Sequence, residues 1–285
     1  MREESKEVAQ QKIVLGGQMA RNSLKNVLRL IDEAKQGLPV EQSFLADLKR
    51  SIELSDKKNF RQGSQAYKPS SMNCVRQMYY MVTGAEAQSE SVYTGIGICN
   101  SGTDIHQRIQ QAVLDMKSNG IDCEYVNVAD YVRSRNLNYL EVKKEPDFEH
   151  GDYETKLYHK TLNMSFLCDG IIKYQNKYYI LELKTESASK FWSRQGVNEA
   201  HFNQGTAYSL SLQINDVIFV YISRDSLDMQ SFMFTPTDDM KQDLVGRIQT
   251  CDEHIQKHVV PKKPADITSK TCTYCNYRTQ CRKDG

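Results

Sequence analysis

Long apolar runs are missing from this sequence of 285 residues. None approaches the roughly 20 consecutive residues that a membrane-spanning helix needs, and the opening Met-Arg-Glu-Glu-Ser-Lys has no secretion-signal character. Net charge is nearly missing too, with a formal value of +1 at pH 7. Hydrophobic residues at 39% and charged residues at 26% are typical of a globular protein. We therefore expect a cytoplasmic protein without a membrane partner, in which nucleic-acid binding would need a local concentration of positive charge.

Internal repeats and low-complexity segments are also absent. One local concentration of positive charge is present, because residues 256–285 hold seven lysines and arginines against two aspartates. A solvated tail explains that segment as well as a binding surface does.

The eight cysteines do not predict disulfides, since nothing in the sequence indicates secretion. Cys272, Cys275 and Cys281 form a C-x2-C-x5-C group, which is typical of a metal site. Three thiolates leave the coordination incomplete. Cys74 is the best fourth candidate, because it opens a predicted helix whose positive end would favour a thiolate. We expect a structural clasp between distant parts of the chain that holds a metal, and Zn²⁺ accepts four thiolates.

The order of the predicted elements indicates an α/β fold with a mixed central sheet flanked by helices. Residues 1–54 are predicted to be helical, with Phe44, Leu45, Leu48 and Ile52 at helical spacing, and residues 55–71 to be a linker. Further predictions are helices towards Gly84, from Ser101 to before Gly120, from Ser189 to Ile214 and from Thr237 to Val259, and strands within 121–165, at 217–222 and at 230–234.

A predicted hairpin at residues 165–186 is the centre of this pattern. Two β-rich runs flank the polar turn around Gln175, and the first contains Asp169. Glu182 and Lys184 are two residues apart in the second run, so their side chains share one face of the strand. We expect the two carboxylates and the ammonium group to meet at a sheet edge.

Paired carboxylates of this kind suit Mg²⁺ or Mn²⁺, which can lower the pKa of bound water and neutralise a phosphodiester. Lys184 would keep its proton beside them and stabilise the developing negative charge. An Asp with a following Glu-x-Lys also arises by chance in many proteins. His106 is a candidate further ligand through its neutral imidazole. Gln204 and Tyr208, four apart on one helix face, could contact a phosphate and a base, or form an ordinary surface pair.

Six segments in this order resemble the PD-(D/E)XK nuclease superfamily, in its RecB-like branch with a four-cysteine iron-sulfur cluster. That branch includes CRISPR-associated exonucleases and phage relatives. The matching segments span roughly residues 70–285 and are Ser70 to Tyr79 with Cys74, Gly102-Thr103-Asp104-Ile105-His106, Asp169-Gly170, Glu182-Leu183-Lys184, Gln204 to Tyr208, and Cys272, Cys275 and Cys281.

The resemblance implies a restriction-endonuclease-like fold and a role for each matching residue. Asp169, Glu182 and His106 would bind Mg²⁺ or Mn²⁺ together with the Leu183 carbonyl, and Lys184 would activate water. Gln204 and Tyr208 would help to engage DNA. Cys74, Cys272, Cys275 and Cys281 would hold a [4Fe-4S] cluster. The family often has one more acidic residue before the aspartate motif, and both Glu141 and Glu145 qualify.

The implied function is a metal-dependent deoxyribonuclease, an exonuclease acting on DNA ends or single strands, in a bacterial or phage-infected cell. The expected organisation is a helical appendage at residues 1–60 and a nuclease domain at 61–285. The appendage has no counterpart in compact members of the family. It leaves open an alternative, a DNA-binding or scaffold protein that acts mainly through its N-terminal helices and a protein partner.

Overall fold

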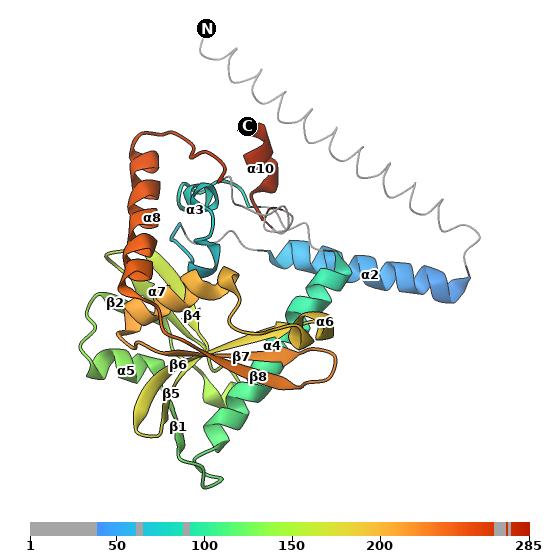
Figure 1. Ribbon diagram of the computed structural model, residues 1–285. Helices are drawn as coiled ribbons and strands as arrows, with labels where there is room; N and C mark the ends of the chain where they lie inside the picture. Colours follow the sequence, from blue (N-terminus) through green and yellow to red (C-terminus); the bar gives the residue numbers. More distant parts are fainter. Residues whose placement is uncertain (1–38, 61–64, 88–91, 265–271, 273–274) are drawn as a thin grey trace, which may run out of the picture. The chain divides into compact units, whose positions relative to one another are not determined.

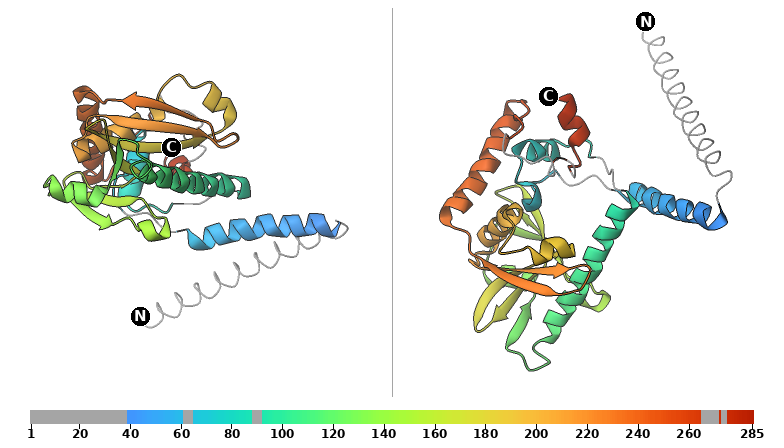
Figure 2. Two further views of the ribbon diagram at one scale, coloured as in Figure 1. Left: turned by 90° about the horizontal axis from the view of Figure 1, so that it is seen from below. Right: turned by 45° about the vertical axis from the view of Figure 1, so that its right-hand side comes forward.

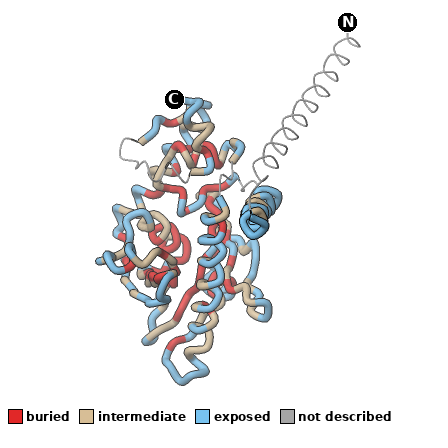
Figure 3. The backbone as a smooth tube through the Cα atoms, turned by 90° about the vertical axis from the view of Figure 1, so that its right-hand side faces the viewer, coloured by how far each residue is buried: buried red, intermediate tan, exposed pale blue. Residues whose placement is uncertain are grey.

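The computed structural model describes residues 39–60, 65–87, 92–264, 272 and 275–285. The chain divides into two compact units, Met1–Lys58 and Asn59–Gly285. In the first unit the predicted helical segment before Gly37 lies outside the described residues. The second predicted segment is helix α2 (Val40–Asn59), which buries none of its side chains, and its tube in Figure 3 carries no buried residue.

The second unit contains a five-stranded sheet in the order β1-β5-β6-β7-β8. Strands β6 and β7 run parallel, and the other neighbours are antiparallel. The sheet is therefore mixed, and helices flank it (Figure 1). This confirms the predicted α/β class. The five strands are β1 (Cys123–Val126), β5 (Gly170–Tyr174), β6 (Lys177–Glu186), β7 (Val217–Ser223) and β8 (Met229–Phe234).

A three-stranded antiparallel sheet accompanies the larger one, with strand order β2-β3-β4. The sequence predicted strands here without their pairing. The strands are β2 (Leu140–Lys144), β3 (Thr155–His159) and β4 (Met164–Cys168). The remaining helices are α3 (Val75–Val82), α4 (Tyr93–Asp115), α5 (Val128–Ser134), α6 (Ala188–Trp192), α7 (Phe202–Leu212), α8 (Asp238–Gln256) and α10 (Arg278–Lys283), with 3₁₀ turns at Pro69–Ser71, Phe148–His150 and Glu199–His201.

Side chains alternate across β6, and a different hydrophobic cluster covers each face of the strand. Leu181 and Leu183 pack in the cluster that includes Ile105 and Ile109 of α4. Ile180 belongs to the main core, to which α7 and α8 contribute. Helix α4 thus lies along one face of the sheet, as the two views of Figure 2 show. Glu182 and Lys184 share the face of Ile180.

Three sequence predictions need correction. The prediction of a linker at residues 55–71 is wrong, because α2 continues to Asn59. Tyr67 is also fully buried, and its hydroxyl donates a hydrogen bond of 2.5 Å to Asp252 of α8. Helix α4 begins at Tyr93, not at Ser101, because the preceding residues, among them the buried Ile96, continue the same helix. The predicted helix from Ser189 is divided into α6, a 3₁₀ turn and α7. In the part of the chain that the structure describes, no helix is both long enough and apolar enough to cross a bilayer.

Candidate active site

Asp169 lies where the chain leaves one sheet and enters the other, between β4 and β5. Gln110 and Tyr125 donate hydrogen bonds to its main-chain carbonyl at 2.7 and 2.9 Å. The main-chain N–H of Leu183 donates to its Oδ2 at 2.7 Å. The predicted hairpin is present as β5 and β6, which pair Gly170 with Leu181. Strand β6 is the central strand of the sheet, however, so the predicted position at a sheet edge is wrong.

Glu182 and Lys184 are joined by a polar network with Gln204 of α7. The Lys184 ammonium group donates to Glu182 Oε1 at 2.5 Å and to Gln204 Oε1 at 3.0 Å. Gln204 Nε2 donates to the same Glu182 oxygen at 2.7 Å and to the Tyr208 hydroxyl at 2.9 Å. The Tyr208 hydroxyl donates to the Leu167 carbonyl at 2.6 Å. The helical pair at 204 and 208 is therefore an interior support for the charged pair.

A further acidic residue lies at this site, and it is neither of the two that the sequence offered. Glu154, Asp169 and His106 each offer a ligand atom, and these atoms lie within 4.8 Å of one another. Glu141 and Glu145 are exposed and form ion pairs elsewhere, Glu141 with Lys143 and Glu145 with Arg133.

Strand register explains why Glu154 is there. Strands β3 and β4 are antiparallel and pair Thr155 with Cys168. The residue before Thr155 therefore lies beside the residue after Cys168, which places Glu154 next to Asp169. The sequence does show an acidic residue directly before a strand. Its place at the site follows only when the register of β3 and β4 is known.

The charged groups at the site change one another's pKa values, in opposite directions for the two carboxyl groups of Glu182 and Asp169. Burial raises the pKa of Glu182 to about 8, and the neighbouring Asp169 adds to the shift. Burial would also raise the pKa of Asp169, but His106, Lys184 and the Leu183 N–H outweigh it, and the pKa is lowered. For Lys184 the two carboxylates outweigh burial and raise the pKa, so the ammonium group keeps its charge. The predicted protonated lysine agrees with this direction.

The donor set fits a divalent cation. Glu182 Oε2 is buried and, among the described residues, has no hydrogen-bond partner. An unpartnered carboxylate oxygen in the interior costs free energy unless a cation or water meets it. Carboxylate oxygens together with one imidazole nitrogen suit Mg²⁺ or Mn²⁺. His106 comes from the middle of α4, and its Nδ1 is 3.7 Å from Asp169 Oδ1. The role of the Leu183 carbonyl stays a prediction.

The site opens into a pocket of about 490 Å³. Its walls come from the 3₁₀ turn at Pro69–Ser71, α4, the small sheet, β6 and α7. The lining residues are Lys68, Pro69, Ser70, His106, Glu154, Lys156, Ser165, Phe166, Leu167, Asp169, Glu182, Lys184, Gln204 and Tyr208.

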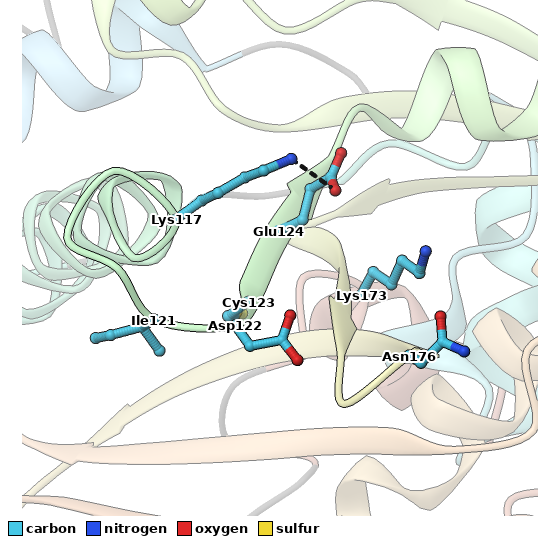
Figure 4. Close-up of a pocket in the computed structure, with 7 residues that line it drawn as sticks. All are labelled: Lys117, Ile121, Asp122, Cys123, Glu124, Lys173 and Asn176. Atoms are coloured by element: carbon cyan, nitrogen blue, oxygen red, sulfur yellow. Dashed lines mark hydrogen bonds and ion pairs between the residues drawn. The ribbon is translucent and has the colours of Figure 1, made fainter.

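A second hollow, shown in Figure 4, lies at the β1 edge of the sheet. Its Lys117 is paired with Glu124 at 2.9 Å, and it contains none of the residues predicted to carry chemistry. We do not assign a site there.

The four predicted cluster cysteines lie within one another's electrostatic reach. Burial raises the pKa of the Cys74 thiol, and the Cys281 and Cys272 thiols raise it further. Burial raises the pKa of the Cys275 thiol. The Tyr277 N–H lowers it, and the other three thiols raise it further. Cys74 is the residue immediately before α3, and the N–H groups there lower its pKa less than burial raises it. The net shift is therefore opposite in direction to the one expected from the helix terminus.

Arg76 holds the C-terminal segment against α3. It is buried, and its guanidinium group donates to the main-chain oxygens of Gly285 and Cys281 at 2.8 and 3.3 Å. Tyr80 adds a hydrogen bond of 2.6 Å to Asp284. The two cysteine-bearing parts of the chain are thus fastened together by polar contacts.

No protein-family model and no curated protein matches this chain. Among solved structures it is similar to SSO0001, with 18% identity, a TM-score of 0.44, and coverage of 87% of this chain and 98% of that one. It is also similar to the alkaline exonuclease LHK-Exo from Laribacter hongkongensis, with 9% identity, a TM-score of 0.34, and coverage of 68% and 89%. The complex of LHK-Exo with dAMP gives 10% identity, the same TM-score and the same coverage. None of these similarities decides the chemistry of this chain.

Proposed function

We propose that this protein is a metal-dependent deoxyribonuclease that hydrolyses phosphodiester bonds from DNA ends or in single strands. The observation that supports this most directly is the unpartnered Glu182 oxygen, buried beside Asp169 and Lys184 in an open pocket. A protein that needed only stability would gain from replacing such a buried, incompletely satisfied group with apolar side chains.

Asp169, Glu182, Glu154 and His106 would hold Mg²⁺ or Mn²⁺. A bound ion of this kind supplies a lowered water pKa and neutralises charge on the phosphate. Lys184, which stays protonated, would orient the attacking water and stabilise the negative charge that develops on the phosphate oxygens. Its distance of 3.0 Å to Gln204 fixes the direction of the ammonium group.

Gln204 and Tyr208 act as positioning residues in this proposal. The Tyr208 hydroxyl already donates to Leu167 and accepts from Gln204, and the Gln204 amide binds both Glu182 and Lys184. These contacts support an interior role in place of the predicted contact with DNA.

The decisive experiment is digestion of end-labelled single-stranded and double-stranded DNA with Mn²⁺ or Mg²⁺, compared with EDTA. We expect metal-dependent products from the wild type and none from Glu182→Ala. Closed circular DNA added in parallel distinguishes an exonuclease, which leaves it intact, from an endonuclease. A Glu149→Ala variant, at an exposed glutamate, serves as the control. Full cleavage by Glu182→Ala would refute the assigned site.

The four cysteines are proposed to hold a [4Fe-4S] cluster, with Zn²⁺ as the alternative occupant. Support comes from their mutual electrostatic contact and from the Arg76 contacts that keep the two chain segments together. Metal analysis after anaerobic preparation tests the assignment. Four iron atoms per chain, lost in Cys275→Ser, are expected, whereas stoichiometric zinc without iron would establish the alternative.

A second role through residues 1–60 is favoured by one observation. Helix α2 exposes six large apolar side chains, which is unusual for a helix without a partner. They are Val40, Phe44, Leu45, Leu48, Ile52 and Leu54. If this segment recruits a protein, deleting residues 1–60 will abolish that association and leave DNA cleavage unchanged.

A further inference from the structure

The pocket that contains the carboxylates opens onto the outer face of the small sheet. Lys156 of β3 and Leu167 of β4 are cross-strand neighbours, and both line the pocket. Side chains alternate across a strand, so the neighbouring Thr155 and Leu157 point inward and are fully buried. Lys156 therefore stands at the mouth of the pocket, on the solvent side of the sheet.

Lys68 contributes a second cation to the same pocket. The preceding Tyr67 forms a parallel bridge with Met164 of β4, so Lys68 follows a residue that flanks β4 on the side away from β3. Lys68 and Lys156 are both exposed, and neither makes an ion pair or side-chain hydrogen bond with any described residue. Other lysines on this sheet are already neutralised, since Lys143 pairs with Glu141 and Lys144 with Asp152. The two lysines at the pocket mouth are thus available for an external anion.

Single solvated lysines are common on protein surfaces and need no ligand. Here the interior of the pocket is acidic, with Glu154, Asp169 and Glu182 lining it. A phosphodiester that approaches such a centre is repelled unless positive groups at the rim offset that repulsion. The two unpaired ammonium groups stand at that rim.

An apolar contact lies beside them. Leu167 is 44% exposed although it sits in the middle of a folded sheet region, and its cross-strand neighbour is Lys156. Proteins bind unpaired nucleotides by combining cations along the phosphates with side chains, most often aromatic and in some sites apolar, against the base faces. Leu167 offers an apolar contact of this kind. A duplex would not present base faces to this surface.

We propose that Lys68 and Lys156 bind the phosphates on either side of the cleaved bond, so that a single strand of DNA crosses the outer face of the β2-β3-β4 sheet. Leu167 contacts an unpaired base next to the scissile phosphate. This inference rests on the proposed nuclease function and specifies which surface receives the substrate and in which strand state.

The test measures the binding of a fluorescein-labelled 20-nucleotide oligothymidylate by anisotropy, in EDTA and over a series of NaCl concentrations. Each phosphate contact contributes a slope of about 0.7 to the dependence of log affinity on log salt for single strands. The Lys68→Gln/Lys156→Gln double variant should therefore lose about 1.4 from that slope. Leu167→Ser should weaken binding without changing the slope, because it removes no charge.

Lys173→Gln is the matched control, since Lys173 lines the hollow of Figure 4 and not the pocket that contains Asp169 and Glu182. An unchanged slope in the double variant, with the wild type binding and cleaving DNA, would overturn the assigned surface and leave the nuclease proposal standing. A wild type that shows the expected slope and its loss, but never cleaves DNA in Mn²⁺, would support the surface and refute the nuclease. Equal loss of slope in Lys173→Gln would refute the surface, because the effect would then be general.

Discussion

The charged groups around Glu182 and Lys184 of β6 form an acidic half and a cationic half. The two halves differ in how completely their side chains are paired. The acidic half contains Asp169, Glu182 and Glu154 beside His106. The cationic half contains Lys184 and Arg194 beside His201. The two histidines show the difference directly. Asp169 outweighs burial and raises the pKa of His106, whereas burial, followed by the charges of Lys184 and Arg194, lowers the pKa of His201 to about 3.

In the cationic half, the side chains of Lys184, Arg194 and His201 each have a hydrogen-bond partner. Arg194 donates from Nε and Nη2 to both carboxylate oxygens of Glu186 and lies 3.9 Å from the ring centroid of Tyr221. The Tyr221 hydroxyl is 2.9 Å from His201 Nδ1. The acidic half, in contrast, leaves Glu182 Oε2 without a partner. A paired structural network therefore borders a site that has an unpartnered carboxylate oxygen. We infer that the acidic half and Lys184 take part in chemistry, whereas Arg194 and His201 have a structural role.

The strongest way to break this comparison is to remove the one cation that both halves share. Lys184→Ala should reduce the rate of DNA cleavage by about 10²–10³-fold, the usual cost of losing one group that stabilises developing negative charge. The fold should persist, because the hydrophobic clusters on both faces of β6 are untouched. Single-turnover cleavage in Mn²⁺ and circular dichroism provide the two measurements.

Lys177→Ala is the control for that variant, as Lys177 begins the same strand but pairs with Asp216. Cleavage by Lys184→Ala at the wild-type rate would show that the cationic half is unnecessary for the reaction. Loss of the folded state would instead show that Lys184 is chiefly structural.

The cationic half can be probed by pH. The folded pKa of His201 is about 3, below the ordinary value of 6.5, so the unfolded chain takes up the proton first as the pH falls. The contribution of His201 to the free energy of unfolding is fully present above pH 6.5. It falls by about 1.4 kcal/mol per pH unit as the pH is lowered from 6.5 towards 3. His201→Phe should flatten this dependence in urea unfolding between pH 6.5 and 4.5. His258→Asn, at an exposed histidine, should leave it unchanged. An unaltered slope in His201→Phe would mean that the ring is not excluded from water.

Sequence reasoning could reach the acidic half because its central residues are close in the chain. Asp169, Glu182 and Lys184 belong to one hairpin, and period-two alternation is enough to put the last two on one face. The pair at Gln204 and Tyr208 follows equally from helical spacing. The α/β class followed from the order of hydrophobic runs.

The rest depended on pairings that local pattern does not contain. Glu154 joins the site through the register of β3 with β4, and β6 becomes central through a parallel partner about 30 residues further along the chain, at Val217. Tyr67 looked like linker because its neighbours are polar, yet its ring is fully buried. Long-range strand pairing and isolated buried aromatics are set by tertiary packing, which overrides the local composition.

The smallest expected effect concerns the unpartnered carboxylate of the acidic half. Glu182→Gln removes one of the buried carboxylates but keeps its size, and the remaining Asp169 and Lys184 balance each other in charge. In EDTA we expect this variant to be more stable than the wild type by about 1 kcal/mol, because the wild type must take up a proton at Glu182 on folding, as burial raises the pKa of that carboxyl to about 8. The midpoint of urea unfolding measures the change, and DNA cleavage should be lost in the same variant.

Saturating Mn²⁺ should stabilise the wild type and leave Glu182→Gln nearly unaffected, since an ion stabilises only the state that binds it. A variant that is less stable in EDTA and still responds fully to Mn²⁺ would mean that Glu182 supports the fold, and that the cation belongs to His106, Glu154 and Asp169 alone.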